Sequence, residues 1–305
     1  MTILYSHPAS DSHVNPPGHP EQVSRRAAVL EALSDLPLDR RDAPLAADAE
    51  VLRCHPARHL DRLRAAVPAK GHVALDADTH MAPGSLTAAL HAVGGACAAV
   101  DAVLSGQDDS AFVALRPPGH HAERETPMGF CLLGTAAIAA MRALDHHGLD
   151  RVAVVDFDVH HGNGTQDLLW TERRAFFAST HQMPLYPGTG AAAERGAHDQ
   201  MLNIPLRPGS GGRDARAAWS AIAQRLRDWR PGLVVISAGF DAHRDDPLAE
   251  LCWDDADFGA VTALIRDAAR DVGAPMVSVL EGGYDLAALG RSARVHVETL
   301  KEPAR

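Results

Sequence analysis

The chain has 305 residues, of which 46% are hydrophobic and 22% are charged, a composition that is typical of a soluble globular protein and excludes a disordered one. Its length leaves open one large α/β domain or two smaller domains, because a single core stops growing at roughly 250–300 residues. The formal charge of -10 argues against a nucleic-acid-binding protein, because such a protein needs a basic face.

The chain has 18 histidines but only 4 cysteines. No two cysteines form a Cys-x-x-Cys pair, which argues against a disulfide scaffold and against a zinc finger built on thiolates. A metal bound by this chain would therefore be held by imidazole and carboxylate groups. The cysteines are Cys54, Cys97, Cys131 and Cys252.

No segment of the sequence reaches the ~20 apolar residues that a transmembrane helix requires. Residues 1–8 lack the charged start and the long apolar stretch of a signal peptide. We therefore expect a cytoplasmic protein with no membrane partner.

Short β-branched runs alternate along the chain with segments of helical period, which indicates a parallel sheet covered by helices on both faces. A Pro- and Gly-rich stretch at residues 182–213 is expected to be irregular, and nothing resembles a linker, so residues 1–305 are interpreted as a single domain. The expected strands are residues 3–5, 111–115, 152–156, 233–237 and 276–280. The expected helices are residues 21–36, 85–104, 135–147, 214–229, 254–272 and 286–300.

Polar residues follow four of these strands at the point where each strand ends. They lie at 116–121, at 156–161, at Asp241 and at 281–284. In open α/β sheets the ligand crevice lies outside the carboxyl ends of the strands. The four segments are therefore predicted to converge on one site.

Asp158 and His160 are spaced so that, in extended backbone, both side chains point to the same face and can grip one ion. A catalytic zinc site takes three protein ligands, and Asp241 is the natural third. Two carboxylates and one imidazole make a harder site than three imidazoles would. The alternative is that Asp158 and His160 only cap a helix that begins near Gly162.

His120 and His121 follow a Pro-Pro-Gly sequence that fixes an irregular loop and can present both rings to a pocket. Imidazoles beside a metal-bound water can serve as general base and general acid. Each ring needs an orienting partner, for which Asp156 and Asn163 are available. The alternative is a solvent-exposed pair of histidines, as we expect at residues 146–147.

Aromatic side chains lie close to these segments in the sequence. Tyr284 follows two glycines, and its phenol can donate to a developing oxyanion; alternatively it is an ordinary half-buried tyrosine. Phe130 and Tyr186 can form the two walls of a slot for an aliphatic chain, with core packing as the alternative. Cys131 is predicted to be a small buried residue and not a nucleophile.

Five motifs, in this order, resemble those of the histone deacetylase family, in its class II and bacterial amidohydrolase branch. The resemblance runs from Gly18 to Tyr284 and implies the arginase–deacetylase fold, a single α/β domain with a mostly parallel eight-stranded sheet. The motifs are residues 116–122, 126–131, 156–165, 237–241 and 280–284.

The resemblance implies two bound metal ions. Zn²⁺ would be held by Asp158, His160 and Asp241. A structural K⁺ would lie beside it, bound by Asp156, Asp158, the His160 carbonyl and Ser179.

The resemblance also implies catalytic roles. His121 would be the general base and acid, with His120 as its electrostatic partner. Asp156 would support His120, and Asn163 would face His121, where class I relatives carry Asp. Tyr284 would polarise the acyl carbonyl of the substrate.

A substrate tunnel is implied as well, lined by Phe130, Gly129, Tyr186 and Gly282. The wall opposite Phe130 is usually Phe in the family, so Tyr186 makes the tunnel mouth more polar. The implied reaction is hydrolysis of an acyl amide, and the expected partner is a small-molecule or peptide acyl-amine substrate, with no nucleic acid and no membrane.

Several alternatives stay open at this point. The substrate is either acetyl-lysine or an acetylated polyamine; Leu248 stands where one polyamine-specific version has an acidic gatekeeper, although Glu123, Glu125 or Asp245 can supply a rim charge. A non-catalytic acyl-lysine reader is the alternative of another class. A homo-oligomer is possible. The sequence 241–245 resembles a ligand motif of binuclear manganese ureohydrolases, but Gly162 occupies a position where such a site needs a carboxylate.

Overall fold

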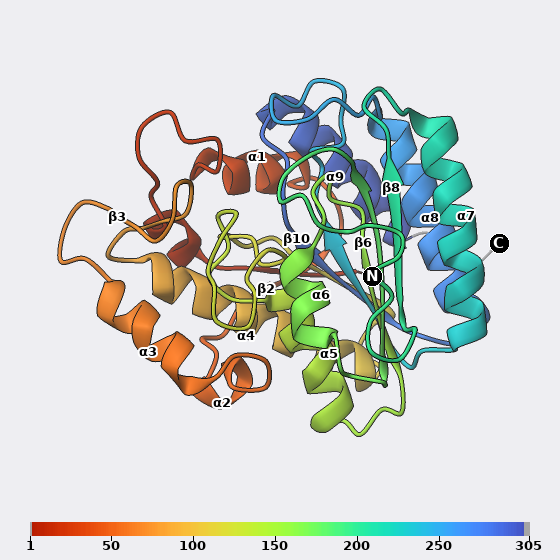
Figure 1. Cartoon of the computed structure of the whole chain (residues 1–305), viewed down its shortest axis with the longest axis horizontal. Coiled ribbons are helices and arrows are strands. Elements are labelled where there is room, and N and C mark those ends of the chain that lie inside the picture. The colour runs from red at the N-terminus through yellow and green to blue at the C-terminus, as the bar shows by residue number, and fades with distance from the viewer. Residues whose placement is uncertain (1, 302–305) are drawn as a thin grey trace.

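The computed structural model describes residues 2–301. Its centre is an eight-stranded sheet in the order β2-β1-β5-β10-β9-β6-β7-β8, in which every neighbouring pair is parallel (Figure 1). The strands are β1 Ile3–Ser6, β2 Asp39–Asp42, β5 Ser110–Val113, β6 Val152–Asp156, β7 Ala175–Gln182, β8 Met201–Leu206, β9 Val234–Ala238 and β10 Met276–Leu280.

Helices cover both faces of this sheet and create two apolar cores, because successive strand residues point to opposite faces. In β6, Val152 and Val154 pack toward α4 (Ser85–Leu104) and α5 (Thr135–Asp145). Ala153 and Val155 pack on the other side. The helices there are α1 Ser24–Ala32, α7 Gly212–Trp229, α8 Asp255–Asp271 and α9 Leu286–Lys301.

The remaining elements are short. These short elements are η1 Pro8–Ser12, α2 Asp48–Val51, α3 Ala57–Ala66, β3 Val73–Ala74, β4 His80–Met81 and α6 Asn163–Leu169. Strands β3 and β4 form a two-stranded antiparallel ribbon outside the main sheet (Figure 1).

The fold class predicted from the sequence is confirmed, but three of the eight strands were missed: the edge strands β2 and β8, and the inner strand β7. The expectation that residues 182–213 are irregular holds for residues 183–200 but is wrong for β8 (Met201–Leu206), which pairs with β7. Pro205 is tolerated because β8 is an edge strand, where one side of the backbone needs no ladder partner. The opposite edge, β2, is Asp-Arg-Arg-Asp, a charged pattern that protects an edge and hides the strand from a search for apolar runs.

Helix α4 contradicts the expectation that no segment is long and apolar enough to cross a membrane. By length and composition α4, with 20 residues, is apolar enough to cross a membrane. In this structure 72% of that apolar window is buried inside the protein, as in the core helix of a soluble protein. The surface of α4 is apolar on nearly all sides, and this suits its position, because β-strands, η1 and α5 contact it on several sides.

Candidate active site

Two carboxylates and one imidazole meet at the carboxyl ends of two adjacent central strands. Asp158 and His160 lie in the loop after β6, and Asp241 lies in the loop after β9. The Nδ1 atom of His160 is 3.1 Å from Asp158 Oδ1 and 3.1 Å from Asp241 Oδ2. All three residues are buried, and their ligand atoms lie within 4.8 Å of one another. The structure thus brings together the three residues that the sequence analysis grouped.

Backbone amides orient these carboxylates. Asp158 Oδ1 accepts the amide of His160 at 2.9 Å, and its Oδ2 accepts the amide of Gly282 at 2.8 Å. Asp241 Oδ1 accepts the amide of Val159 at 2.9 Å. The side chains of Asp158 and Asp241 therefore connect the loops after β6, β9 and β10, and they leave little freedom in the placement of the remaining oxygen of Asp241.

Two glycines make room for the carboxylates. A Cβ atom on Gly239 would lie 2.0 Å from Asp158 Oδ2, and one on Gly282 would lie 2.1 Å from Asp241 Oδ2. Gly282, which the resemblance places in the tunnel wall, packs directly against both carboxylates. Its lack of a side chain leaves room for these two groups.

The charges of this group fit a cation. Burial opposes ionisation of Asp158, yet His120 and His160 hold its pKa below the usual range. Burial lowers the pKa of His160, but hydrogen bonds to Asp158 and Asp241 outweigh it and raise the value to about 10. Burial, followed by the charge of Asp158, raises the pKa of Asp241. Two buried carboxylates that draw positive charge onto an imidazole form a donor set that suits a divalent ion such as zinc.

The two adjacent histidines differ in charge state. His120 Nδ1 donates to Asp156 Oδ2 at 3.0 Å, and His121 Nδ1 donates to Asn163 Oδ1 at 2.7 Å. Burial lowers the pKa of His120, but Asp158 and Asp156 outweigh it and raise that pKa well above 6.5. Burial, helped by the charge of His120, lowers the pKa of His121 well below 6.5. Neighbouring groups whose pKa values are pushed apart can divide acid and base roles, and the neutral His121 is suited to be the base.

Glu281, which was given no role from the sequence, fixes the backbone of the loop that holds His120 and His121. Its Oε2 accepts the backbone amides of Gly119 at 2.6 Å and His120 at 3.1 Å. Burial raises the pKa of Glu281 to about 7. Its position at the end of β10, directly before the Gly-Gly-Tyr sequence, was a signal that could have found it.

Tyr284 is buried at one side of the site, and two further unpredicted residues fix it. Asp246 Oδ2 accepts the Tyr284 amide at 2.7 Å, and the Arg25 guanidinium carbon lies 4.9 Å from the Tyr284 ring centroid. The Arg25 Nε donates to the carbonyl of Gly283 at 2.6 Å. Burial raises the pKa of Tyr284 well above 10, so its hydroxyl stays protonated and able to donate.

A cavity of about 240 Å³ opens onto these groups. The ring centroid of Tyr186 is 5.2 Å from that of His121, and the centroid of Phe130 is 5.8 Å from that of Tyr284. Gly129 is required because its φ is 53° and a Cβ there would lie 2.4 Å from the His121 ring. The cavity is lined by Asp78, His121, Gly129, Phe130, His160, Leu185, Tyr186, Leu248 and Tyr284.

The residues predicted to hold potassium are neighbours across two strands. Asp156 in β6 lies opposite Ser179 in β7, and Ser179 Oγ is 3.0 Å from His181 Nδ1. Asp156 Oδ1 accepts the amide of Asp158 at 3.0 Å. A Cβ on Gly162 would lie 2.3 Å from Asp156 Oδ2, so this position also leaves space beside a carboxylate.

Other histidines lie outside this site. His55 lies in the loop between α2 and α3 and is buried there; its Nε2 accepts the Gly134 amide at 2.9 Å, and its Nδ1 lies 3.1 Å from the Arg124 carbonyl. His243, in the sequence that resembles a manganese motif, lies 3.2 Å from Asp255, so its Nε2 is engaged away from the ligand group. Cys131 is buried, as predicted, and burial raises its pKa well above 9.

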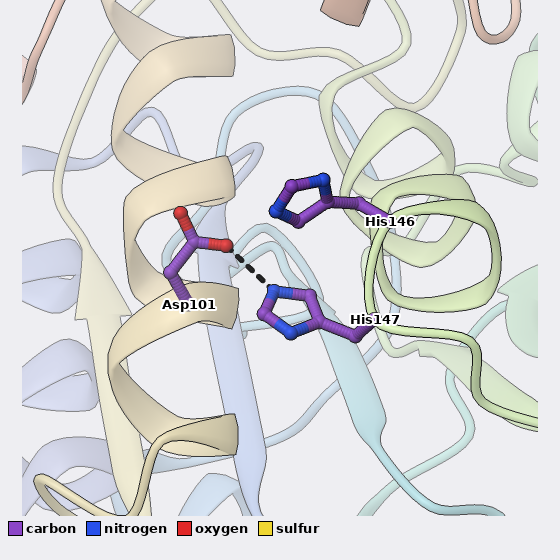
Figure 2. Close-up of side chains that lie close together, drawn as sticks. All are labelled: Asp101, His146 and His147. Atoms are coloured by element: carbon purple, nitrogen blue, oxygen red, sulfur yellow. Dashed lines mark hydrogen bonds and ion pairs between the residues drawn. The ribbon is translucent and has the colours of Figure 1, made fainter.

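A second carboxylate–imidazole group lies on the surface. His146 and His147, at the end of α5, both project toward Asp101 of α4 (Figure 2). His147 Nε2 is 2.7 Å from Asp101 Oδ1, and Arg142 donates to each Asp101 oxygen at 2.7 Å. The guanidinium of Arg142 already neutralises this carboxylate, so a further cation there would be repelled.

The parallel sheet, with a carboxylate–imidazole triad and an acid–base pair at the carboxyl ends of its strands, has the arginase–deacetylase architecture. Comparisons with known proteins agree with this class. The family model for the histone deacetylase domain matches residues 19–300. The chain belongs to the histone deacetylase family, whose members are deacetylases and amidohydrolases.

The similar proteins include bacterial and archaeal deacetylases and amidohydrolases. A histone deacetylase-like amidohydrolase of Pseudomonas aeruginosa is 41% identical, over 91% of this chain and 74% of its own length. A probable deacetylase of Methanothermobacter thermautotrophicus is 39% identical, over 96% of this chain and 88% of its own. The crystal structure of the HDA15 HD domain superimposes with a TM-score of 0.93 at 30% identity, covering 99% of this chain and 91% of that one.

Proposed function

We propose that this protein is a zinc-dependent enzyme that hydrolyses acetyl or similar acyl amides of cationic amines. The observation that carries the proposal is the cavity of about 240 Å³, in which His121, His160 and Tyr284 meet between the aromatic walls Phe130 and Tyr186. A slot between two rings suits an unbranched aliphatic chain that ends in an amide. The deacetylase and amidohydrolase relatives support the same reaction class.

Asp158, His160 and Asp241 would hold the zinc ion, since a nitrogen and carboxylate oxygens are ligands that zinc prefers. When bound, zinc supplies Lewis acidity for the acyl oxygen and lowers the pKa of a coordinated water. We further propose a structural K⁺ bound by Asp156, Asp158, the His160 carbonyl and Ser179, a set of oxygen ligands of the kind that hard cations prefer.

The protein's own groups account for the proton transfers. His121 is neutral, and its Nδ1–H is held by Asn163, so Nε2 is free to take a proton from the attacking water. The hydroxide oxygen bonds to the acyl carbon, and Tyr284 donates a hydrogen bond to the carbonyl oxygen as negative charge develops there. When the C–N bond breaks, the proton on His121 Nε2 passes to the leaving nitrogen, which restores the neutral ring.

Charge on the cavity wall favours a cationic amine. Asp78 is one of the residues that line the cavity, and the whole chain has a formal charge of -10. Acetyl-lysine in a peptide and an N-acetylated polyamine both offer a cationic or amide group beyond an aliphatic chain. Turnover of an acetyl-lysine peptide, acetylputrescine, acetylcadaverine and acetylspermidine distinguishes them: a preference for the peptide supports a lysine deacetylase, and a preference for the small amines supports an acetylpolyamine amidohydrolase.

Zinc content and activity test the proposal together. Removal of metal by a chelator should abolish hydrolysis, and added zinc should restore it. Zinc-loaded protein that binds an acyl-lysine peptide but hydrolyses none of the four substrates would overturn the proposal in favour of a non-catalytic acyl-lysine reader.

A further inference from the structure

Glu123 is a half-buried carboxylate two residues after His121, which lines the cavity, and the mechanism above does not use it. Its Oε1 accepts a hydrogen bond from Asn163 Nδ2 at 2.8 Å. The Oδ1 of the same Asn163 accepts the Nδ1–H of His121 at 2.7 Å. Glu123, Asn163 and His121 therefore form a chain of side-chain hydrogen bonds that ends at the general base.

The amide of Asn163 has two orientations, related by a half-turn, that occupy nearly the same volume. One presents its carbonyl oxygen to His121, and the other presents its NH2 group. Only the first places the imidazole proton on Nδ1 and leaves the lone pair of Nε2 for the attacking water. Catalysis by His121 therefore requires that something choose between the two orientations.

The surroundings of Asn163 make that choice. An ionised glutamate accepts hydrogen bonds and cannot donate them, so Glu123 attracts the NH2 group. The sulfur of Met128, also an acceptor, lies 3.3 Å from Asn163 Nδ2. Both groups face the same nitrogen, and Asn163 is 5% exposed, so water does not offer it a competing partner.

Glu123 is available for this role because no basic side chain pairs with it within residues 2–301. Its backbone amide donates to the Thr126 carbonyl at 3.0 Å, which closes the loop that carries it. Glu125, two residues along the same loop, is engaged differently: its carboxylate pairs with Arg58 at the surface. The two glutamates thus lie in one loop but contact different side chains, Asn163 and Arg58.

We propose that Glu123 is a positioning residue that fixes the orientation of the Asn163 amide and thereby the tautomer of His121. This inference rests on the proposed function, in which His121 is the general base. It predicts that Glu123 affects the rate of the chemical step and not the affinity for cationic substrates.

The test compares Glu123→Gln with Glu125→Gln. A glutamine at 123 can accept or donate, so both amide orientations become accessible. We expect kcat to fall about ten-fold, the effect of losing one charge-assisted hydrogen bond, while KM changes less than about two-fold for a charged and an uncharged acyl-amine alike. Glu125→Gln should leave kcat unchanged, because the Glu125 carboxylate pairs with Arg58. Equal behaviour of the two variants, or a rise in KM confined to cationic substrates, would overturn the proposal, the second by making Glu123 a rim charge.

A second background separates positioning from general structural support. In Asn163→Asp the carboxylate has no donor to misorient, so adding Glu123→Gln should cause no further loss. A ten-fold loss in that background as well would show that Glu123 does not act through Asn163.

Nitrogen NMR of the His121 ring reads the tautomer directly and does not depend on activity. The wild type should show a protonated Nδ1, and Glu123→Gln should show a mixture of tautomers. An unchanged spectrum would refute the inference even where no substrate has been found, whereas a wild type that hydrolyses no acyl amide would refute the proposed function alone.

Discussion

Two groups of carboxylate and imidazole side chains in this protein look alike when only their composition is considered. Asp158, His160 and Asp241 form one, and Asp101 with the pair 146–147 forms the other; in both, the potential ligand atoms lie within 4.8 Å of one another. They differ in what already neutralises the carboxylate. Spacing of ligand atoms alone therefore does not identify a metal site.

In the surface group the Asp101 side chain is 41% exposed and has Arg142 on both oxygens. In the buried group Asp158 and Asp241 are inaccessible to solvent and face backbone amides and the ring of His160. An unpaired buried carboxylate is costly, so the buried group gains most from a cation, whereas the surface group has nothing to gain.

We expect the largest effect when one carboxylate of the buried group is replaced. Asp241→Asn should remove zinc and lower activity by more than about 10³-fold, because an amide replaces an anionic ligand that the ion needs. Asp101→Asn is the matched control and should keep the zinc content and activity of the wild type. Metal analysis and an amidase assay on both variants decide the matter; zinc lost from Asp101→Asn and retained by Asp241→Asn would reverse the comparison.

Tyr284→Phe, beside the buried group, separates the proposed reaction from metal binding. Loss of the hydroxyl should lower kcat by about 10²–10³-fold, as for removal of one oxyanion donor, with zinc still bound. Tyr186→Phe serves as the control, because that phenol lies in the cavity wall and loses only polarity. Unchanged turnover in Tyr284→Phe would remove the assigned role.

The sequence predicted the buried group because its members are marked locally. Asp158 and His160 are two residues apart, and Asp241 follows an apolar run that is recognisable as a central strand. The parallel sheet followed from the same apolar runs, whereas β2, β7 and β8 did not. β2 and β8 are edge strands, which need only part of their surface apolar, and β7 is apolar only at residues 175–178, before four polar residues.

The supporting residues could not be predicted in the same way. Glu281 acts on the backbone amides of residues 119–120, and Arg25 acts on the carbonyl of Gly283. These partners are brought together by the packing of distant segments, and a backbone amide carries no side-chain signature in the sequence. Hydrogen bonds of this kind become visible only when the fold places the segments side by side.

Glu281, which supports the loop of His120 and His121, leads to a prediction about how stability depends on pH. Its pKa is raised by burial from 4.5 to about 7, so between these values the folded protein binds a proton that the unfolded chain has lost. Stability should therefore fall as the pH rises from about 4.5 to 7, by up to about 3 kcal/mol from this residue. In Glu281→Gln this contribution disappears. Urea unfolding of both proteins at pH 5.5 and 8 measures the difference; equal pH dependence of the two would show that the carboxyl is not protonated in the fold.

We expect the smallest effect in the surface group, where the stability contributed by Asp101 should fall as the pH is lowered, opposite to that of Glu281. Burial raises the pKa of Asp101, but hydrogen bonds from Arg142 and His147 outweigh it and hold that pKa below the usual range. A lowered carboxyl pKa gives stability that is present above the unfolded pKa and is lost as the pH falls through the folded one. Because the side chain is partly exposed, Asp101→Asn should cost no more than about 1 kcal/mol at pH 7, and less at low pH. Urea unfolding at pH 7 and 4 measures this cost. A cost of several kcal/mol that depends on added zinc would make Asp101 a metal ligand, and solvent exposure and Arg142 would then no longer distinguish the two groups.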